Sequence, residues 1–155
     1  MGLPMNNTVL LVDDEPSVLR GYQRNIGLMF DTKTAGSGEE ALELLKNEDK
    51  YALIMSDHRM GGMTGVDLLR KAREIRPNTV RMLITGYADV KISLQAINEG
   101  SVFRMLTKPC DPQSFYSAIE DGLRQHELIT SEKQLLDQTL KGAVQMLGDI
   151  MSVLD

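Results

Sequence analysis

Short apolar runs alternate with longer amphipathic segments along most of this chain. The first run, Val9–Val12, contains no polar residue, as in a strand that is buried on both faces. Further runs follow at residues 32–35, 52–55, 80–85 and 102–106, the first of these being the weakest. The segments between the runs carry apolar residues at helical spacing, such as Val18, Leu19, Tyr22 and Ile26. Alternation of strand and helix predicts a parallel sheet with helices on both faces.

Start signals support the expected helices. Pro16 suits the first turn of the first helix, and Ser37 with Glu40 forms a capping box before the second. Pro112 marks the start of a fifth helix, which is expected to run to about His126. The sequence therefore predicts the α/β class: five βα units in a doubly wound parallel sheet, with a helical, coiled-coil extension at the C-terminus.

Polar side chains collect where the predicted strands end. Asp13 and Asp14 follow the first strand, Asp57 ends the third, Thr85 ends the fourth and Lys108 follows the fifth. In doubly wound sheets the functional site lies beyond these carboxyl ends. Crowded carboxylates repel one another, and Mg²⁺, which prefers oxygen ligands, would relieve that repulsion. A metal ion and a lysine in an acidic pocket are suited to phosphoryl transfer onto a carboxylate.

Taken together, these residues resemble the receiver domain of two-component response regulators, which has a flavodoxin-like fold. The matching motifs are residues 11–16, residues 57–60 with Gly65, residues 85–86 and residues 108–109. The set is specific because every motif falls at the end of its expected strand, whereas any single motif would be weak. The resemblance covers a receiver domain at residues 6–126 and leaves residues 127–155 as a helical linker.

The resemblance implies a role for each acidic residue. Asp57 would accept a phosphoryl group from a histidine kinase, a phosphotransfer protein or a small phosphodonor. Mg²⁺ would be bound directly by Asp14, through water by Asp13, and also by Asp57 and the backbone carbonyl of Arg59. The chain itself would then be no enzyme beyond its own phosphorylation and dephosphorylation.

The same resemblance assigns the residues that sense the phosphoryl group. Thr85 would hydrogen-bond one phosphoryl oxygen, and Lys108 would pair with another. Phe103, expected on the fifth strand, would be the aromatic switch that turns inward when Thr85 moves. Lys108-Pro109 is similar to the turn in which this family uses a cis proline.

Two positions depart from the family pattern. Gly61 stands where a proline is usual and loosens the loop after Asp57, and Gly86 stands where an alanine is usual and keeps access open. Arg59 and Tyr87 are bulky at positions that, in this family, tune the lifetime of the phosphoryl group. We therefore expect that these side chains hinder the attack of water on the phosphoryl group and that the phosphorylated state is long-lived.

Composition excludes several classes of protein. A chain of 155 residues with 42% hydrophobic and 25% charged residues fits one domain plus an appendage. The net charge of −5 argues against a direct nucleic-acid binder. No apolar run approaches the length of a membrane span, and residues 1–8 lack the features of a signal peptide, so a cytoplasmic protein is expected.

The single cysteine, Cys110, is expected to be structural, and His58 is expected to be solvated.

The last segment has a coiled-coil pattern. Apolar residues recur at alternating steps of four and three: Leu136, Leu140, Ala143, Leu147, Ile150 and Leu154. Ser131 with Gln134 would cap a new helix, or the fifth helix simply continues. A homodimer through this helix, or docking to another domain, is favoured over a helix folded back on its own receiver, because the expected helices already cover both faces of the sheet.

The pattern is still apolar at Leu154, which predicts that an output domain follows in a longer protein. Residues 135–142 and the helix after them resemble linkers that precede HD-type domains, whose output is often an HD-GYP-type cyclic-di-GMP phosphodiesterase. A stand-alone receiver or a degenerate dimerisation scaffold is the alternative. A phosphohydrolase similar to haloacid dehalogenases is disfavoured, because Arg59 occupies the place of its second carboxylate.

Overall fold

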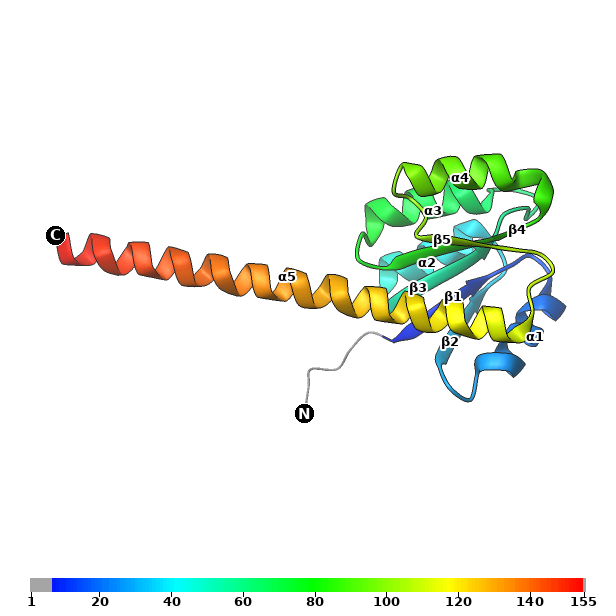
Figure 1. The fold of residues 1–155 in the computed structure, drawn as a ribbon, viewed down its shortest axis with the longest axis horizontal. Coiled ribbons are helices and arrows are strands. Elements are labelled where there is room, and N and C mark those ends of the chain that lie inside the picture. The colour runs from blue at the N-terminus through cyan, green and yellow to red at the C-terminus, as the bar shows by residue number, and fades with distance from the viewer. Residues whose placement is uncertain (1–6, 155) are drawn as a thin grey trace.

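The computed structural model describes residues 7–154, which form one parallel sheet with helices on both faces (Figure 1). The strands are β1 (Thr8–Val12), β2 (Asp31–Ala35), β3 (Tyr51–Asp57), β4 (Val80–Thr85) and β5 (Arg104–Thr107). Their order in the sheet is β2-β1-β3-β4-β5, and all neighbouring strands are parallel. The predicted doubly wound α/β fold is therefore confirmed.

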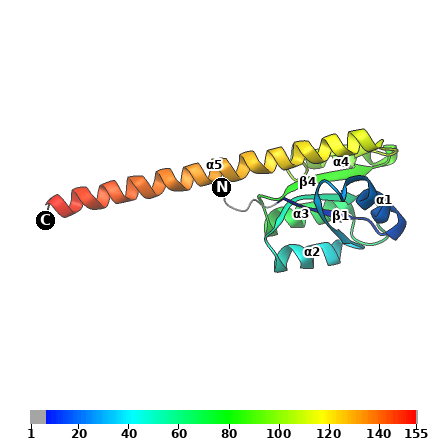
Figure 2. The ribbon, with the colours of Figure 1, turned by 90° about the horizontal axis from the view of Figure 1, so that it is seen from below.

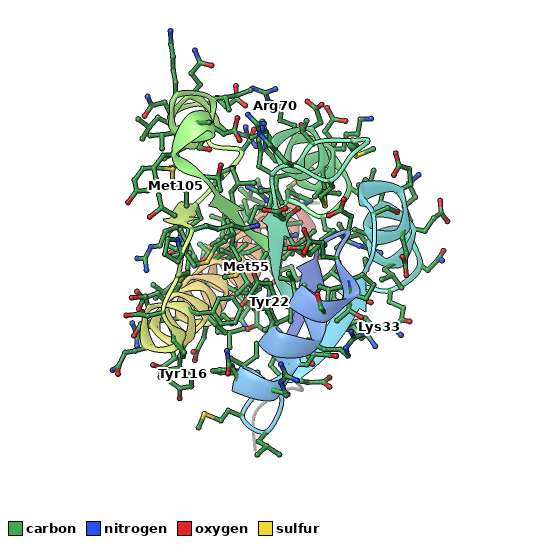
Figure 3. All side chains as sticks on the ribbon, turned by 90° about the vertical axis from the view of Figure 1, so that its right-hand side faces the viewer. Tyr22, Lys33, Met55, Arg70, Met105 and Tyr116 are labelled. Carbon is green, nitrogen blue, oxygen red and sulfur yellow. The ribbon has the colours of Figure 1, made fainter. Side chains whose placement is uncertain are left out.

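The helices divide between the two faces of the sheet. They are α1 (Pro16–Ile26), α2 (Gly38–Asn47), α3 (Gly65–Ile75), α4 (Val90–Asn98) and α5 (Pro112–Leu154), with a short 3-10 helix at Tyr87–Asp89. Helices α1 and α5 pack on one face, and α2, α3 and α4 on the other. Every residue of β1 and β3 is buried, which explains why these strands show continuous apolar runs. Figure 3 places Met55 of β3 in the middle of the molecule and Met105 of β5 nearer its edge.

The fifth strand begins later than expected. The sequence predicted a strand at residues 102–106, whereas β5 covers Arg104–Thr107. Val102 is buried in the loop before it, so its apolar character reflects burial and not strand geometry. The prediction that Phe103 lies on the strand is wrong, because Phe103 only donates its backbone N–H to the carbonyl of Arg81 as the chain enters the sheet.

Helix α5 continues without a break from Pro112 to Leu154, so the alternative of a new helix at Ser131 is wrong. Its first part lies against the sheet, and the remainder extends away from the domain (Figure 2). Every residue from Ser131 to Leu154 is exposed, so this segment does not fold back on its own receiver. None of the helices between residues 7 and 154 has the length and apolar character that crossing a membrane requires.

Candidate functional site

The register of the sheet brings the acidic residues together. Val12 in β1 is paired with Ser56 in β3, so Asp13 emerges level with Asp57. Carboxylate oxygens of Asp13, Asp14 and Asp57 all lie within 4.8 Å of one another. Residues that are far apart in sequence therefore form one acidic pocket at the carboxyl edge of the central strands.

Asp13 is the most buried member of this pocket, with 1% of its surface exposed. Its Oδ1 accepts a hydrogen bond of 2.9 Å from the backbone N–H of Glu15, while its buried Oδ2 has no hydrogen-bond partner among residues 7–154. Burial raises the pKa of Asp13 above its ordinary value, the Glu15 N–H opposes this shift, and the nearby charge of Asp57 adds to it. A buried, unpartnered carboxylate oxygen beside two more carboxylates fits a divalent cation.

Lys108 follows directly after β5 and reaches Asp57, at the end of β3, across the end of β4. Its Nζ lies 2.8 Å from Oδ1 of Asp57, and its backbone N–H donates to the carbonyl of Thr85 at 2.9 Å. Partial burial lowers the pKa of Lys108, but the hydrogen bond to Asp57 and the charges of Asp57 and Asp13 outweigh it, so the pKa is raised overall. The peptide bond between Lys108 and Pro109 is cis, as the family resemblance implied.

Thr85 is almost fully buried beside this pocket, and its hydroxyl donates a hydrogen bond of 3.3 Å to the carbonyl of Gly86. It is paired in register with Thr107 of β5. Phe103 lies four residues before Thr107, which is about 13 Å along an extended chain. The structure therefore does not bring Phe103 beside Thr85.

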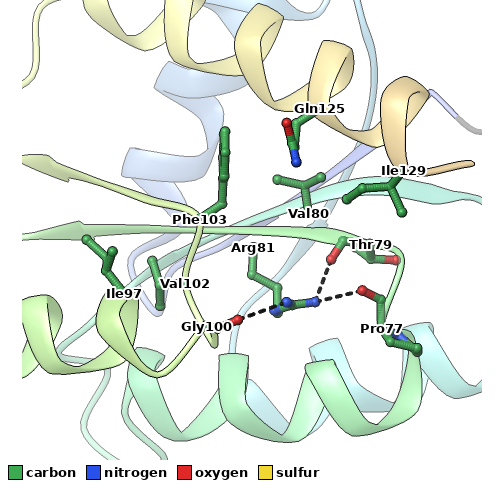
Figure 4. Close-up of a pocket in the computed structure, with 10 residues that line it drawn as sticks. All are labelled: Pro77, Thr79, Val80, Arg81, Ile97, Gly100, Val102, Phe103, Gln125 and Ile129. Atoms are coloured by element: carbon green, nitrogen blue, oxygen red, sulfur yellow. Dashed lines mark hydrogen bonds between the residues drawn. The ribbon is translucent and has the colours of Figure 1, made fainter. Parts of the chain in front are cut away.

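Phe103 lines a different part of the molecule. Figure 4 shows its ring on the same side of the sheet as Gln125 and Ile129 of α5. Phe103 is 39% exposed, and the centroid of its ring lies 5.6 Å from the guanidinium carbon of Arg104. The guanidinium of Arg81, below the strand in this view, donates to backbone carbonyls, including that of Gly100. Phe103 and Arg81 therefore belong to the end of the sheet that lies away from Asp57.

The loop after Asp57 is held by backbone contacts. Gly61 has a φ of 73°, a left-handed conformation that glycine adopts without strain, so this departure from the family pattern has a local reason. The backbone N–H of Gly65 donates to the carbonyl of His58 at 2.8 Å. The expectation that His58 is solvated is wrong: its side chain is buried, and its Nδ1 accepts from the N–H of Val66 at 3.4 Å, at the start of α3.

An ion pair links the loop after Asp57 to the 3-10 helix Tyr87–Asp89. The Nε of Arg59 lies 2.8 Å from one carboxylate oxygen of Asp89, and its second nitrogen donor lies 3.1 Å from the other. This pairing with Arg59 lowers the pKa of Asp89. Tyr87, by contrast, is 78% exposed. No sequence signal identified Asp89, because it lies 30 residues from Arg59 and only the fold brings the two together.

The sequence also did not identify Tyr22 as a neighbour of the site. Its ring stacks on Phe115 with a centroid separation of 4.6 Å. Burial raises the pKa of Tyr22, and the negative charges of Asp13 and Asp57 raise it further. Cys110 is half-buried, and burial raises the pKa of its thiol, which disfavours the reactive thiolate form.

Comparison with known proteins identifies the family. The family model described as the response regulator receiver domain matches residues 9–120. The chain is 35% identical to the transcriptional regulatory protein GlrR of Escherichia coli, over 81% of this chain and 28% of that protein. It is 31% identical to the hydrogenase transcriptional regulatory protein HoxA of Cupriavidus necator, over 90% of this chain and 29% of that protein. The chain thus spans less than a third of these curated relatives.

Solved structures that resemble this chain point to the same family. A structure described as adenylate cyclase from Rhodopirellula baltica matches with a TM-score of 0.84 and 43% identity, covering 86% of this chain and 98% of that one. The signal receiver domain of an HD domain-containing protein from Pseudomonas fluorescens matches with a TM-score of 0.75 and 30% identity, covering 86% of this chain and 96% of that one. With the acidic pocket and the doubly wound sheet, these matches show that the chain belongs to the response regulator receiver domains of two-component systems.

Proposed function

We propose that Asp57 is the phosphoacceptor of this receiver, supplied by a histidine kinase, a phosphotransfer protein or a small phosphodonor. The observation that carries this proposal is the contact of 2.8 Å between Lys108 Nζ and Asp57 Oδ1, beside two further carboxylates. An aspartate that is 8% exposed and still reachable from solvent suits transfer of a small group from a donor.

The proposed step is an in-line displacement. One carboxylate oxygen of Asp57 forms a bond to phosphorus as the bond between phosphorus and the donor's nitrogen or oxygen breaks. Asp13, Asp14, Asp57 and the backbone carbonyl of Arg59 would hold Mg²⁺, which supplies positive charge to the phosphoryl oxygens. Lys108 would pair with one of those oxygens and keep it oriented. The chain performs no other catalysis in this proposal.

Incubation with Mg²⁺ and acetyl phosphate, followed by intact mass, tests the assignment. We expect one added phosphoryl group in the parent protein and none in Asp57→Asn. Asp67→Asn is the matched control, because Asp67 is an exposed aspartate on α3, outside the pocket. Equal modification of the parent and Asp57→Asn would reject Asp57 as the acceptor.

We propose that Thr85 couples phosphorylation to conformation by leaving the carbonyl of Gly86 for a phosphoryl oxygen. Such a bond favours the active arrangement over the inactive one and shifts their populations. Met105 replaces Phe103 as the proposed partner of this switch. Met105 is half-buried, packs with the cluster under α3 and α4, and lies on the same face of β5 as Thr107, the residue paired with Thr85.

Arg59→Ala is expected to shorten the lifetime of the phosphorylated protein several-fold. Arg59 follows Asp57 by two residues, and its bond to Asp89 restrains a bulky side chain near the acceptor, which we propose hinders attack by water. The decay of phosphorylated protein after removal of acetyl phosphate measures this. Arg70→Ala is the control, since Arg70 forms a similar exposed ion pair with Glu99 away from the site. An unchanged lifetime in Arg59→Ala would contradict the proposed hindrance.

We further propose that residues 6–126 are the receiver and residues 127–155 the linker to an output module in a longer, cytoplasmic protein. The exposed apolar residues of α5 after Ser131 support self-association through this linker. An HD-type cyclic-di-GMP phosphodiesterase is one candidate output, supported by the linker pattern and by the similar receiver of an HD domain-containing protein. The relatives named as transcriptional regulators support a second candidate, a transcriptional output.

Removal of residues 131–154 is expected to convert a dimer into a monomer. All of these residues are exposed and none belongs to the buried core, so the receiver is expected to keep its fold without them. Molar mass from light scattering, compared between the two lengths of chain, measures the change. A monomer at both lengths would contradict self-association through the linker.

A further inference from the structure

A cavity lies at the edge of the sheet where β5 begins late. The pairing of β5 with β4 starts at Met82, and just ahead of it the N–H of Phe103 donates to the carbonyl of Arg81 at 2.8 Å. Val80 and Arg81, the first residues of β4, therefore lie ahead of the paired stretch. A cavity of about 310 Å³ lies along this edge (Figure 4). Cavities of about 300–1,000 Å³ are typical of sites that bind small molecules.

Most of the cavity wall is apolar. Val80, Phe103 and Ile129 line it on the face of the sheet that carries α5. Ile97 and Val102 line it on the opposite face. Since water is a poor solvent for hydrocarbon, a ligand that packs against these side chains gains free energy through an apolar body of its own.

The guanidinium of Arg81 is the one charged group among the ten described residues that line the cavity. Its Nε donates to the carbonyl of Ser101 at 2.9 Å, and one terminal nitrogen donates to the carbonyls of Pro77 and Thr79 at 3.2 Å and 2.9 Å. The other terminal nitrogen donates to the carbonyl of Gly100 at 3.3 Å. These bonds hold the side chain between the turn before β4 and the turn before β5.

The positive charge of Arg81 has no counter-charge. Backbone carbonyls accept four of its five N–H donors but do not neutralise it. Within residues 7–154, no carboxylate forms an ion pair with Arg81. Burial lowers the pKa of Arg81, and the positive charge of Arg73 lowers it further. An anionic group in the cavity would offset this charge and accept the remaining N–H.

We propose that this cavity binds a small carboxylate with an apolar body, such as a medium-chain fatty acid. The carboxylate pairs with the guanidinium of Arg81, and the hydrocarbon packs against Val80, Phe103 and Ile129. A neutral hydrocarbon leaves the guanidinium without a counter-charge. A dicarboxylate places its second charge against apolar walls, where desolvation is costly. One charge and one apolar body therefore match the lining best.

The cavity reaches α5 just before this helix leaves the domain. Gln125 and Ile129 line it, and every residue from Ser131 to Leu154 is exposed. A bound ligand adds contacts between the last packed turns of α5 and the edge of β4. Binding therefore holds the start of the linker more firmly against the receiver, and amide hydrogen exchange of residues 125–130 is expected to slow.

Titration of the isotope-labelled protein with octanoate, followed by NMR spectroscopy, tests this proposal. Without Mg²⁺ or a phosphodonor, and below the concentration at which octanoate forms micelles, we expect saturable shifts in the amide signals of residues 100–104 and 125–129. Octanol has the same chain length but no charge. It is expected to bind about tenfold more weakly than octanoate, because it cannot pair with Arg81.

Phe103→Glu tests the charge of the cavity from the protein's side. It adds a negative charge to the wall and keeps Arg81, whose replacement would also break four backbone hydrogen bonds. We expect octanoate to bind this variant at least about tenfold more weakly than the parent. Leu28→Glu is the matched control, because it adds the same charge at a fully exposed residue outside the cavity. Circular dichroism confirms that both variants are folded.

Three results would overturn the proposal. The first is the absence of saturable shifts in residues 100–104 and 125–129 of the parent. The second is binding of octanol as tightly as octanoate, which would remove Arg81 as the partner of a carboxylate. The third is undiminished binding of octanoate by folded Phe103→Glu, which would place the ligand outside this cavity.

Discussion

Replacing Gly65 with alanine is expected to destabilise the fold by about 3 kcal/mol and to disturb the phosphorylation site. An added Cβ would lie 2.3 Å from the carbonyl oxygen of Asp57, 2.7 Å from Leu83 Cδ1 and 2.9 Å from His58 Cα. Two of these atoms belong to the backbone and cannot rotate away. Any shift would also strain the hydrogen bond of 2.8 Å between the N–H of Gly65 and the carbonyl of His58.

Urea denaturation followed by circular dichroism measures this effect, with acetyl phosphate labelling as a second readout. Gly62→Ala is the control in the same loop, because in the described part of the chain its added Cβ would have no atom within 4 Å apart from those of its own chain neighbours. Its free energy of unfolding is expected to stay within about 0.5 kcal/mol of the parent. Equal stability of the two variants would show that the close approach of α3 to β3 does not require glycine at position 65.

Asp13→Asn is expected to stabilise the metal-free protein by about 1 kcal/mol at neutral pH while removing its stabilisation by Mg²⁺. Burial and the charge of Asp57 raise the pKa of Asp13, so the folded state binds the proton more tightly than the unfolded state does. Stability therefore falls as pH rises above the ordinary value of 3.8 through the raised pKa. The neutral amide of asparagine carries no charge and so avoids this loss of folding stability, but it is a poorer ligand for Mg²⁺ than a carboxylate.

The parent and Asp13→Asn are each denatured at pH 7, once with EDTA and once with excess Mg²⁺. The test compares the four resulting free energies of unfolding. Asp49→Asn is the control, since Asp49 is an exposed aspartate whose nearest ionic partner, Arg76, is 3.9 Å away. The interpretation fails if Asp13→Asn is less stable than the parent in EDTA, or if Mg²⁺ stabilises both proteins equally.

Local sequence patterns predicted the fold well where burial and periodicity coincide. The continuous apolar runs of β1 and β3 reflect strands covered on both faces, and the capping box at Ser37 and Glu40 matches the observed bond from the N–H of Glu40 to Ser37 Oγ. The same reasoning misplaced the start of β5, because Val102 is buried in a loop and burial alone does not distinguish a loop from a strand.

The sequence by itself determined the class of the fold, the acidic residues at the strand ends, and the helical spacing of apolar residues after Ser131, because each depends on the spacing of residues that are close in the chain. Only the tertiary structure decided that Arg59 pairs with Asp89, that Phe103 lies far from Thr85, and that His58 is buried. Contacts of this kind depend on strand register and on how helices cross the sheet. Strand register and helix orientation are set by packing of the whole domain, so they cannot be derived from any short stretch of the sequence.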